Sequence, residues 1–355
     1  MKLVFLNLTQ GLAMRGLERV IDLYATELSN NHSVTVIQAG PIISGRRYHT
    51  IRTHDLDLAP QAAPNNLLEK LLFRLESDPT SIETVKFTND AMPELIKLDP
   101  DLIIVGNGAP QLRILKQKLP NKKIVAFGQA GLGHHDIKTL LAVPDLFIAL
   151  TNSQASWCKP YTNSKTKIIV IPNPVIMPKK SKKIDLKLPH PIVLTVGALS
   201  RYKNIVSTAK ALKNLAISHL IIGDGEEGNK LQDVLSARPA DFRWIKQVDP
   251  DMMQDYYHAS DVFCFTPDPR EAFGNVYIEA MASSLPIVAT NDPVRREIIG
   301  NSGYYVDPGQ PDEVRQAVLT ALSVGRLDYR EQLKKFDIKV VSKLLEKALY
   351  ELIKE

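Results

Sequence analysis

The chain has 355 residues, a formal net charge of +5 and a sequence pI near 8.9. Its hydrophobic content of 44% is enough for the cores of two domains and excludes a disordered chain, and no apolar run approaches the roughly 20 residues that span a bilayer. The mild positive charge suits anionic ligands or an anionic membrane surface as well as it suits nucleic acid. The two distant cysteines, Cys158 and Cys264, lack metal-ligand spacing, so we expect a reduced cytoplasmic protein.

The first half of the chain alternates strands and helices. It opens on MKLVFLNLTQG, which is too short and too strand-like for a signal peptide and predicts a buried strand over residues 2–8. A helix is predicted over residues 16–29, where apolar side chains recur at helical spacing: Leu17, Val20, Ile21, Tyr24, Ala25 and Leu28. Further buried strands are predicted at residues 33–38, 101–107, 123–127 and 145–150.

Residues 41–100 are less regular. The segment NLLEKLLFRLES carries leucines along one helical stripe: Leu67, Leu68, Leu71, Leu72 and Leu75. This stripe predicts a helix that faces the core. A basic amphipathic helix resting on a membrane is the alternative, because Lys70 and Arg74 lie beside the leucines.

A lysine- and proline-rich segment, MPKKSKKIDLKLPHP, separates the two halves and predicts a linker. Beyond it, strands are predicted at residues 192–196, within 220–227 and at 286–290, and helices at about 311–323 and 339–354. We therefore predict two Rossmann-like, doubly wound parallel-sheet domains of α/β class, with these bounds: residues 1–176, a linker at 177–190, residues 191–336 and a C-terminal helix at 337–355. Because ligands bind outside the carboxyl ends of parallel strands, we expect the site in a cleft between the domains.

The stretch DPREAFGNVYIEAMASSLPIVAT, residues 268–290, carries the strongest chemical signal. Glu271 and Glu279 are separated by seven residues, and Gly274 precedes a predicted helix, NVYIEAMASS. A glycine before a helix lets an anion approach the backbone, and the helix N-terminus then favours a phosphate. One carboxylate on each side of such a phosphate site suits a nucleotide-sugar. The alternative is an acid near a helix start and an acid on a solvated face.

A second signal follows the predicted strand at residues 192–196. That strand ends at Gly197, and the loop after it carries Arg201 and Lys203. A mobile lysine at the carboxyl end of a parallel strand can neutralise a diphosphate. The next strand ends in a Gly-Asp-Gly turn that begins at Gly223, which by itself can be a simple tight turn.

These segments resemble a known family. EAFGNVYIEAMA, PIVAT and REIIGNSGYYVDP are similar to the E-x7-E region of retaining glycosyltransferase family 4, within the glycogen-synthase-like group 1 glycosyltransferases. The resemblance covers nearly the whole chain, strongly over residues 190–323 and loosely over 40–122. It implies the GT-B fold, a terminal helix that returns to the first domain, and a retaining, metal-independent transfer from a nucleoside diphosphate sugar to a hydroxyl.

The resemblance also implies which residues meet the donor. It gives the catalytic roles to Glu271 and Lys203, and it places Glu279 on the ribose. Gly16 is included because RGLER resembles the Gly-Gly-x-Glu-Arg segment of the family, with Arg15 in the first glycine slot. The implied donor-binding residues are Gly16, Gly197, Arg201, Lys203, Gly223, Lys246, Val248, Glu271, Phe273, Gly274, Asn275, Val276 and Glu279.

Two departures from the family pattern bear on this site. Ala198 stands where the family has an arginine, and Arg201, further along the loop, is the candidate to replace it. Gln129 stands in or beside the slot of a family histidine, and His134 and His135 come later. These three residues are candidates for contact with the sugar or the acceptor, although a surface histidine is the default interpretation of either His.

No cofactor is expected beyond the nucleoside diphosphate sugar as co-substrate, with UDP as the first expectation and GDP as the next. No metal is expected, because VDPDMM, which contains Asp249 and Asp251, fits a turn and a helix N-cap better than a metal-binding DxD. The resemblance implies a glycan or lipid-linked acceptor in cell-surface polysaccharide or glycolipid synthesis. We expect a cytoplasmic location with contact to the inner face of an anionic membrane, and no nucleic acid partner.

Two other interpretations stay open. A nucleotide-sugar epimerase or a phosphorylase of the same fold would use a similar donor site. A non-catalytic partner subunit that binds a nucleotide or sugar is suggested by Ala198 and the missing histidine. Retention of both glutamates and Lys203 argues against the latter.

Overall fold

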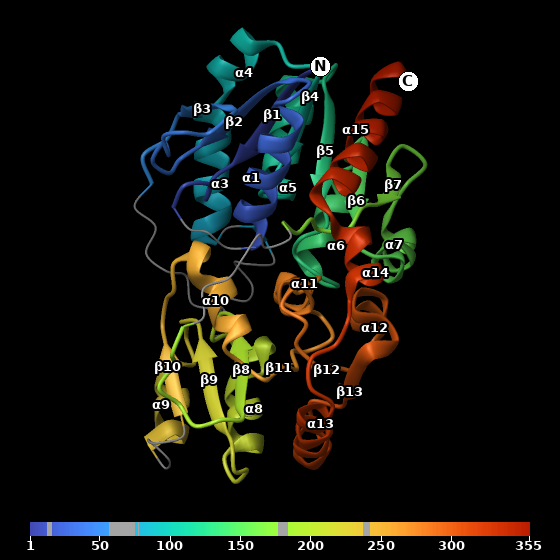
Figure 1. Cartoon of the computed structure of the whole chain (residues 1–355). Coiled ribbons are helices and arrows are strands. Elements are labelled where there is room, and N and C mark those ends of the chain that lie inside the picture. The colour runs from blue at the N-terminus through green and yellow to red at the C-terminus, as the bar shows by residue number, and fades with distance from the viewer. Residues whose placement is uncertain (13–15, 57–74, 77, 177–183, 237–241) are drawn as a thin grey trace. The chain divides into compact units, whose positions relative to one another are not determined.

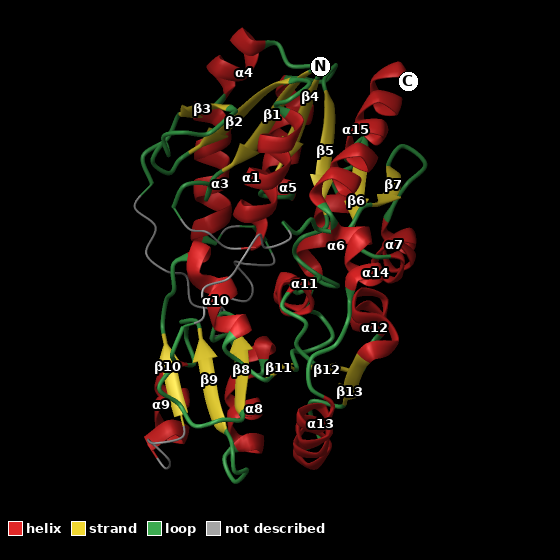
Figure 2. Cartoon of the chain, viewed as in Figure 1, coloured by secondary structure: helices red, strands yellow, loops and turns green. Residues whose placement is uncertain are grey.

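The structure is a computed structural model that describes residues 1–12, 16–56, 75–76, 78–176, 184–236 and 242–355 (Figure 1). It divides into two compact units, Met1–Pro174 with Ile338–Glu355, and Val175–Asp337. Each unit has a parallel sheet with helices packed on it, so the predicted fold class is confirmed (Figure 2). The expected cleft between the domains stays a prediction. The linker was predicted at residues 177–190; residues 177–183 lie outside the described part of the chain, and residues 184–190 form neither helix nor strand.

In the described residues, the first unit has a seven-stranded sheet in the order β3-β2-β1-β4-β5-β6-β7. Its strands are β1 Lys2–Asn7, β2 Ser33–Gln38, β3 His49–Arg52, β4 Leu102–Val105, β5 Lys123–Phe127, β6 Leu146–Ala149 and β7 Lys167–Val170. Every pairing is parallel, with Leu3 opposite both Val34 and Leu102. Such strands are buried on both faces, which is why their sequences are nearly continuous apolar runs.

Two hydrophobic cores cover the two faces of this sheet. Alternate β1 residues divide between them, since Leu3 and Phe5 enter one core and Val4 and Leu6 enter the other. The helices of the unit are α1 Gly16–Leu28, α3 Pro79–Asp90, α4 Met92–Leu98, α5 Ala109–Lys118, α6 His134–Leu141, α7 Asn152–Cys158 and α15 Ile338–Lys354.

The last helix, α15, belongs to the first unit. Its buried side chains share a core with those of α1, and the set from both helices is Val20, Ile21, Tyr24, Ala25, Leu28, Val341, Leu345, Ala348, Leu349 and Leu352. The residues that precede α15 belong to the second unit. The first unit is therefore built from both ends of the chain.

Among the elements of the first unit for which the sequence predicted no bounds are β3, α3 and α4. The buried face of α3 consists of Ser81, Thr84, Phe87 and Thr88, so it lacks the apolar periodicity by which helices are recognised. Its start is instead marked by Asp78, whose carboxylate accepts the backbone N–H groups of Thr80 and Ser81. Of the leucine-striped helix, only Leu75 is described; it lies in a turn and is 64% exposed, and the other leucines lie outside the described residues.

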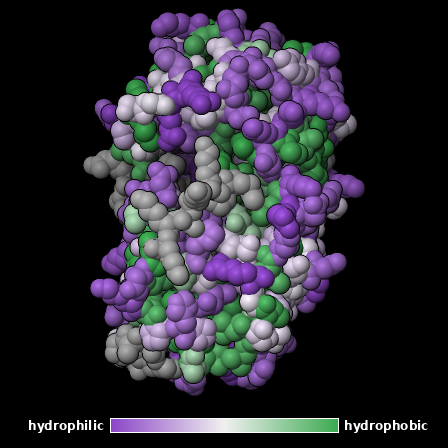
Figure 3. Space-filling view, viewed as in Figure 1, coloured by the Kyte–Doolittle hydropathy of each residue, from purple (hydrophilic) through white to green (hydrophobic). Residues whose placement is uncertain are grey.

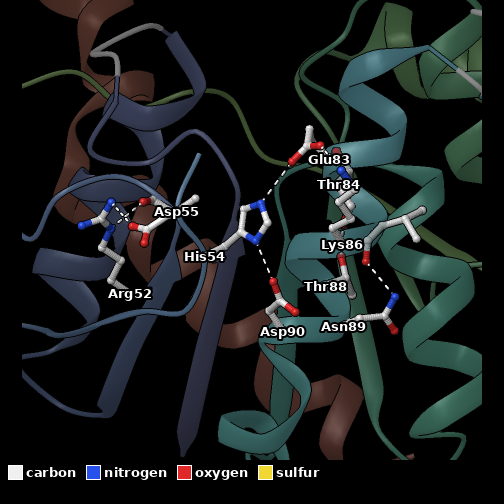
Figure 4. A network of polar contacts seen from close by, with 11 residues as sticks. Arg52, His54, Asp55, Glu83, Thr84, Lys86, Thr88, Asn89 and Asp90 are labelled. Atoms are coloured by element: carbon white, nitrogen blue, oxygen red, sulfur yellow. Dashed lines mark hydrogen bonds and ion pairs between the residues drawn. The ribbon is translucent and has the colours of Figure 1, made fainter. Parts of the chain in front are cut away.

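Figure 4 shows how the segment after β3 is joined to α3. The imidazole of His54 lies 2.6 Å from an oxygen of Asp90 and 3.1 Å from an oxygen of Glu83. Burial disfavours the charged imidazolium, but the hydrogen bonds to the two carboxylates outweigh it, so the pKa of His54 is raised. The ring also packs edge-on against Phe87. A polar contact therefore ties this edge strand to a helix whose apolar face is small.

In the described residues, the second unit has a six-stranded parallel sheet in the order β10-β9-β8-β11-β12-β13. Its strands are β8 Ile192–Val196, β9 Ser218–Ile222, β10 Phe242–Ile245, β11 Val262–Phe265, β12 Ile287–Thr290 and β13 Gly303–Val306. Its helices are α8 Ile205–Leu212, α9 Gly228–Ser236, α10 Met253–His258, α11 Asn275–Ala282, α12 Pro293–Ile299, α13 Pro311–Val324 and α14 Arg330–Leu333. The chain runs outward from β8 through β9 to β10, and β11 begins the other half of the sheet, so β8 and β11 flank a topological switch point.

On the face of the molecule in Figure 3, hydrophilic side chains prevail and hydrophobic ones are scattered among them. Within the described residues, no helix is long and apolar enough to cross a membrane. Both cysteines are free thiols, and burial raises the pKa of each to about 12.

Candidate active site

The two residues that were predicted to be catalytic follow the two strands at the switch point. Lys203 ends a short 3-10 helix, Arg201–Lys203, after β8, and Glu271 lies in the loop between β11 and α11. Their side chains meet in an ion pair between the Lys203 ammonium and the Glu271 carboxylate. Open α/β sheets bind ligands at such switch points, so these loops form the centre of the candidate site.

The ion pair is largely withdrawn from water. The side chain of Lys203 is 15% exposed and that of Glu271 is 9% exposed. The ammonium also lies 5.0 Å from the ring centre of Tyr202 and 5.7 Å from that of Phe265. Charges in such surroundings interact more strongly than in water. An anionic ligand that reaches Lys203 would therefore gain more than it would from a solvated lysine.

Hydrogen bonds to main-chain carbonyls hold the two loops together. The backbone N–H of Asp268 donates to the carbonyl of Tyr202 at 2.7 Å, and the side-chain amide of Asn204 donates to the carbonyl of Thr266 at 3.2 Å. The position of Lys203 thus depends on the loop that carries Glu271, and the position of Glu271 depends on the loop that carries Lys203.

Gly274 begins α11 in the way the sequence predicts. Its φ of 80° lies in the left-handed region, and an added Cβ would lie 2.7 Å from ring carbons of Tyr277. Gly274 is itself the N-cap residue, and it has no side chain with which to cap the helix. The N-terminus of α11, with Asn275 and Val276 as its first residues, is therefore suited to an anionic group.

Glu279 lies about one turn into α11. The hydroxyl of Tyr257 donates to its carboxylate at 2.9 Å, and Tyr257 itself is fully buried. This contact from α10 fixes one carboxylate oxygen. The predicted role of Glu279 on a ribose stays a prediction, and Tyr257 is a supporting residue that the sequence did not reveal.

The loops after β9 and β10 lie at the same edge of the sheet. Gly223 approaches the loop after β8 so closely that an added Cβ would lie 1.9 Å from the carbonyl oxygen of Gly197. The carbonyl of Gly223 also accepts the indole N–H of Trp244 at 2.7 Å. Lys246, which is exposed, lies over the Trp244 ring, and Val248 is half-buried. These loops therefore leave Lys246 and Val248 at the edge of the sheet where the Lys203 loop also lies.

Some predicted site residues do not point to a ligand. The side chain of Phe273 is 1% exposed and packs edge-on against Phe336, so a ligand could meet only its main chain. Arg201 and Ala198 are both exposed, and replacement of the missing arginine by Arg201 stays a prediction. Asp249 accepts the backbone N–H of Asp251 at 2.9 Å, which confirms its predicted role as a helix N-cap.

The remaining candidates belong to the first unit. Gly16 is the exposed first residue of α1, and His134 and His135 are exposed at the start of α6. Gln129 pairs side chain to side chain with Asn173, through two amide hydrogen bonds of 2.6 and 3.1 Å. Whether these residues meet the same ligand as Lys203 stays a prediction.

A buried carboxylate supports the loop that carries Gln129. Asp136 is 2% exposed and accepts hydrogen bonds from the backbone of Ala130 and Gly131 and from the amide of Gln154. Burial raises the pKa of Asp136 to about 8. Sequence reasoning missed this residue, because an acid in the first turn of a helix ordinarily signals only a helix N-terminus.

Residues 177–340 match the model of the family described as glycosyl transferases group 1. An uncharacterized glycosyltransferase from Haemophilus influenzae is 30% identical over 242 residues, which are 63% of this chain and 65% of that relative. The match therefore spans less than two thirds of the relative.

Solved structures resemble the whole chain. Sucrose-phosphate synthase from Thermosynechococcus elongatus has a TM-score of 0.81 and 18% identity over 99% of both chains. HepE from Anabaena, solved in complex with UDP-glucose, has a TM-score of 0.72 and 16% identity over 99% of this chain and 100% of its own. At such identities the likeness shows the fold alone. Residues 177–340 are therefore similar to group 1 glycosyl transferases, and both units together have the fold of the solved transferases and synthases.

Proposed function

We propose that the protein is a retaining, metal-independent glycosyltransferase that moves a sugar from a nucleoside diphosphate sugar to a hydroxyl of a glycan or lipid-linked acceptor. The observation that carries the proposal is the placement of Lys203 and Glu271 on the two loops of the switch point, next to the glycine-started helix α11. The likeness to HepE, which was solved with UDP-glucose, supports a UDP-sugar as the donor.

The geometry suggests a division of roles among these residues. Lys203 and the N-terminus of α11 stabilise the negative charge that develops on the leaving diphosphate. Glu279, held by Tyr257, binds the ribose, and Glu271 binds hydroxyls of the sugar. In this proposal the leaving phosphate oxygen takes the proton of the acceptor hydroxyl, on the face from which the diphosphate departs. The new glycosidic bond then keeps the configuration of the donor without a covalent nucleophile.

Nucleotide binding tests the donor site first. The melting temperature is measured with UDP, GDP, ADP, TDP and CDP, for the natural protein and for Glu279→Ala. A ligand at ~100 times its Kd stabilises the folded state by about 2.7 kcal/mol. We expect one nucleotide to raise the melting temperature and Glu279→Ala to abolish most of that rise.

The matched control is Glu331→Ala, which removes an exposed acid of α14 in the same unit. It should keep the full rise. If none of the five nucleotides raises the melting temperature, the transferase proposal loses its support and the non-catalytic alternative gains it.

The retaining mechanism is tested with Glu271→Gln. We expect this variant to lower kcat by roughly 100-fold, because an interaction that orients the reacting sugar is lost. The anomeric configuration of the product, followed by NMR, should match that of the donor. A sugar adduct on the protein in the mass spectrum would contradict the single-step mechanism, and an inverted product would contradict retention.

Release of nucleoside diphosphate separates the transferase from an epimerase. A transferase releases it at an appreciable rate only when an acceptor is present, whereas an epimerase releases none. Contact with an anionic membrane stays a prediction from composition, since most of the leucine stripe and the lysine-rich part of the linker lie outside the described residues.

A further inference from the structure

Arg295 is the largest fully buried side chain in the described part of the chain, and it is 0% exposed. It lies on α12, which follows β12, and its neighbour Asp292 starts that helix. A buried cation is costly unless it is paired and its donors are satisfied. The hydrogen-bond partners of the Arg295 guanidinium therefore show which parts of the structure this buried cation holds in place.

The guanidinium of Arg295 joins α12 to the loop that carries Glu271. Its Nε donates to the carboxylate of Asp292 at 2.7 Å. Its Nη1 donates to the backbone carbonyl of Glu271 at 2.8 Å, and its Nη2 to that of Pro269 at 3.1 Å. Lysine could not reproduce this arrangement, because a planar guanidinium donates in several fixed directions and an ammonium is a point charge on a flexible stem.

Other side chains hold the preceding part of the same loop. The carbonyl of Phe265 accepts from the hydroxyl of Tyr277 at 2.7 Å, and that of Pro267 accepts from the hydroxyl of Thr290 at 2.5 Å. The loop is thus fixed through its carbonyl oxygens along its length. Arg295 holds the end of the loop nearest the catalytic candidate Glu271, since it donates to the backbone carbonyl of Glu271 itself.

We infer that Arg295 is a positioning residue that orients Glu271 toward the donor sugar and against Lys203. The inference rests on the proposed function, because Arg295 affects the rate of sugar transfer only through the proposed role of Glu271. Arg295 fixes the main chain of residue 271, so the direction of the Glu271 side chain depends on the guanidinium. A displacement of about 1 Å in a reacting group can cost roughly 100-fold in rate.

The test replaces Arg295 by lysine, which keeps the positive charge but lacks the planar guanidinium that donates in several directions at once. We expect Arg295→Lys to lower kcat by roughly 10- to 100-fold with little change in the KM of the donor. Hydrogen exchange of the backbone amides in residues 266–274 should become faster. Unchanged kcat together with unchanged exchange would overturn the inference.

The matched control is Arg326→Lys in the same unit. Arg326 also holds backbone carbonyls, those of Ser283, His258 and Ser260, at 2.6 to 2.8 Å. Its replacement should lower the melting temperature but change neither kcat nor the exchange of residues 266–274. An equal loss of kcat in both variants would show that Arg295 acts only through stability.

A double variant separates positioning from general damage. In the Glu271→Gln background, Arg295→Lys should lower kcat by less than about 2-fold, because the residue through which it acts is already altered. The same fold loss in both backgrounds would contradict positioning. If Arg295→Lys does not fold, Asp292→Asn replaces it, since this change keeps the guanidinium and weakens only its carboxylate partner.

The exchange measurement requires no enzymatic activity. If the natural protein transfers no sugar, the proposed function fails, and the comparison of Arg295→Lys with Arg326→Lys still shows whether Arg295 fixes the loop.

Discussion

Lys203→Met is expected to lower the rate of sugar transfer by at least about 100-fold, since it removes the charge that stabilises the leaving diphosphate. It should also destabilise the protein. The carboxylate of Glu271, 9% exposed, would lose its ion-pair partner. Removing one member of a buried pair typically costs about 3–5 kcal/mol. Steady-state kinetics and urea unfolding measure the two effects.

Two further variants give this prediction its controls. Lys210→Met removes an exposed lysine of α8 in the same unit, and it should change neither kcat nor the free energy of unfolding appreciably. In Lys203→Met with Glu271→Gln, the unpaired carboxylate is also removed. That double variant should be more stable than Lys203→Met alone. Equal stability of the two would show that the ion pair contributes little to folding.

Gly223→Ala is expected to destabilise the second unit by about 3 kcal/mol or more, because overpacking and a strained backbone act together. The φ of Gly223 is +141°, and the added Cβ would lie 1.9 Å from the carbonyl oxygen of Gly197. Both groups belong to the backbone at the ends of neighbouring strands, so neither can turn away as a side chain would.

Urea unfolding followed by the fluorescence of Trp244 measures this effect, in a Trp157→Phe background so that the signal reports the second unit. The control is Gly325→Ala in the same unit, where φ is +70° but an added Cβ meets no atom within 4 Å among the contacts that the structure describes, so that it carries the backbone strain without the overpacking. An unchanged unfolding midpoint for Gly223→Ala would show that the β8 and β9 loops separate easily. Nucleotide binding should then be tested in the same variant.

Most of the fold could be predicted because parallel strands leave a clear pattern. β2, β5 and β8 have the predicted bounds, since each consists mainly of apolar and β-branched residues. The pattern failed for α3, whose buried face consists largely of hydroxyl side chains. Composition there resembles a loop, and only packing in three dimensions identifies a helix.

The site was predictable to a similar degree. Glu271, Gly274 and Lys203 could be found because their chemistry lies in short local segments. Their meeting could not, since it depends on β11 pairing with β8 across more than sixty residues of chain, as the pairing of Val262 with Val193 shows. Arg295 gave no signal either, because an arginine in the first turn of a short helix is ordinarily a surface residue.

The discontinuity of the first unit has a consequence for how the protein is made. On the ribosome, residues 1–174 emerge first, but the part of the apolar face of α1 that packs against α15 stays uncovered until α15, which is synthesised after the whole second unit, has left the exit tunnel. The second unit is complete by residue 337 and can fold while the first still exposes hydrophobic surface. Premature termination after residue 337 would therefore give a chain with one finished domain and one in need of a chaperone.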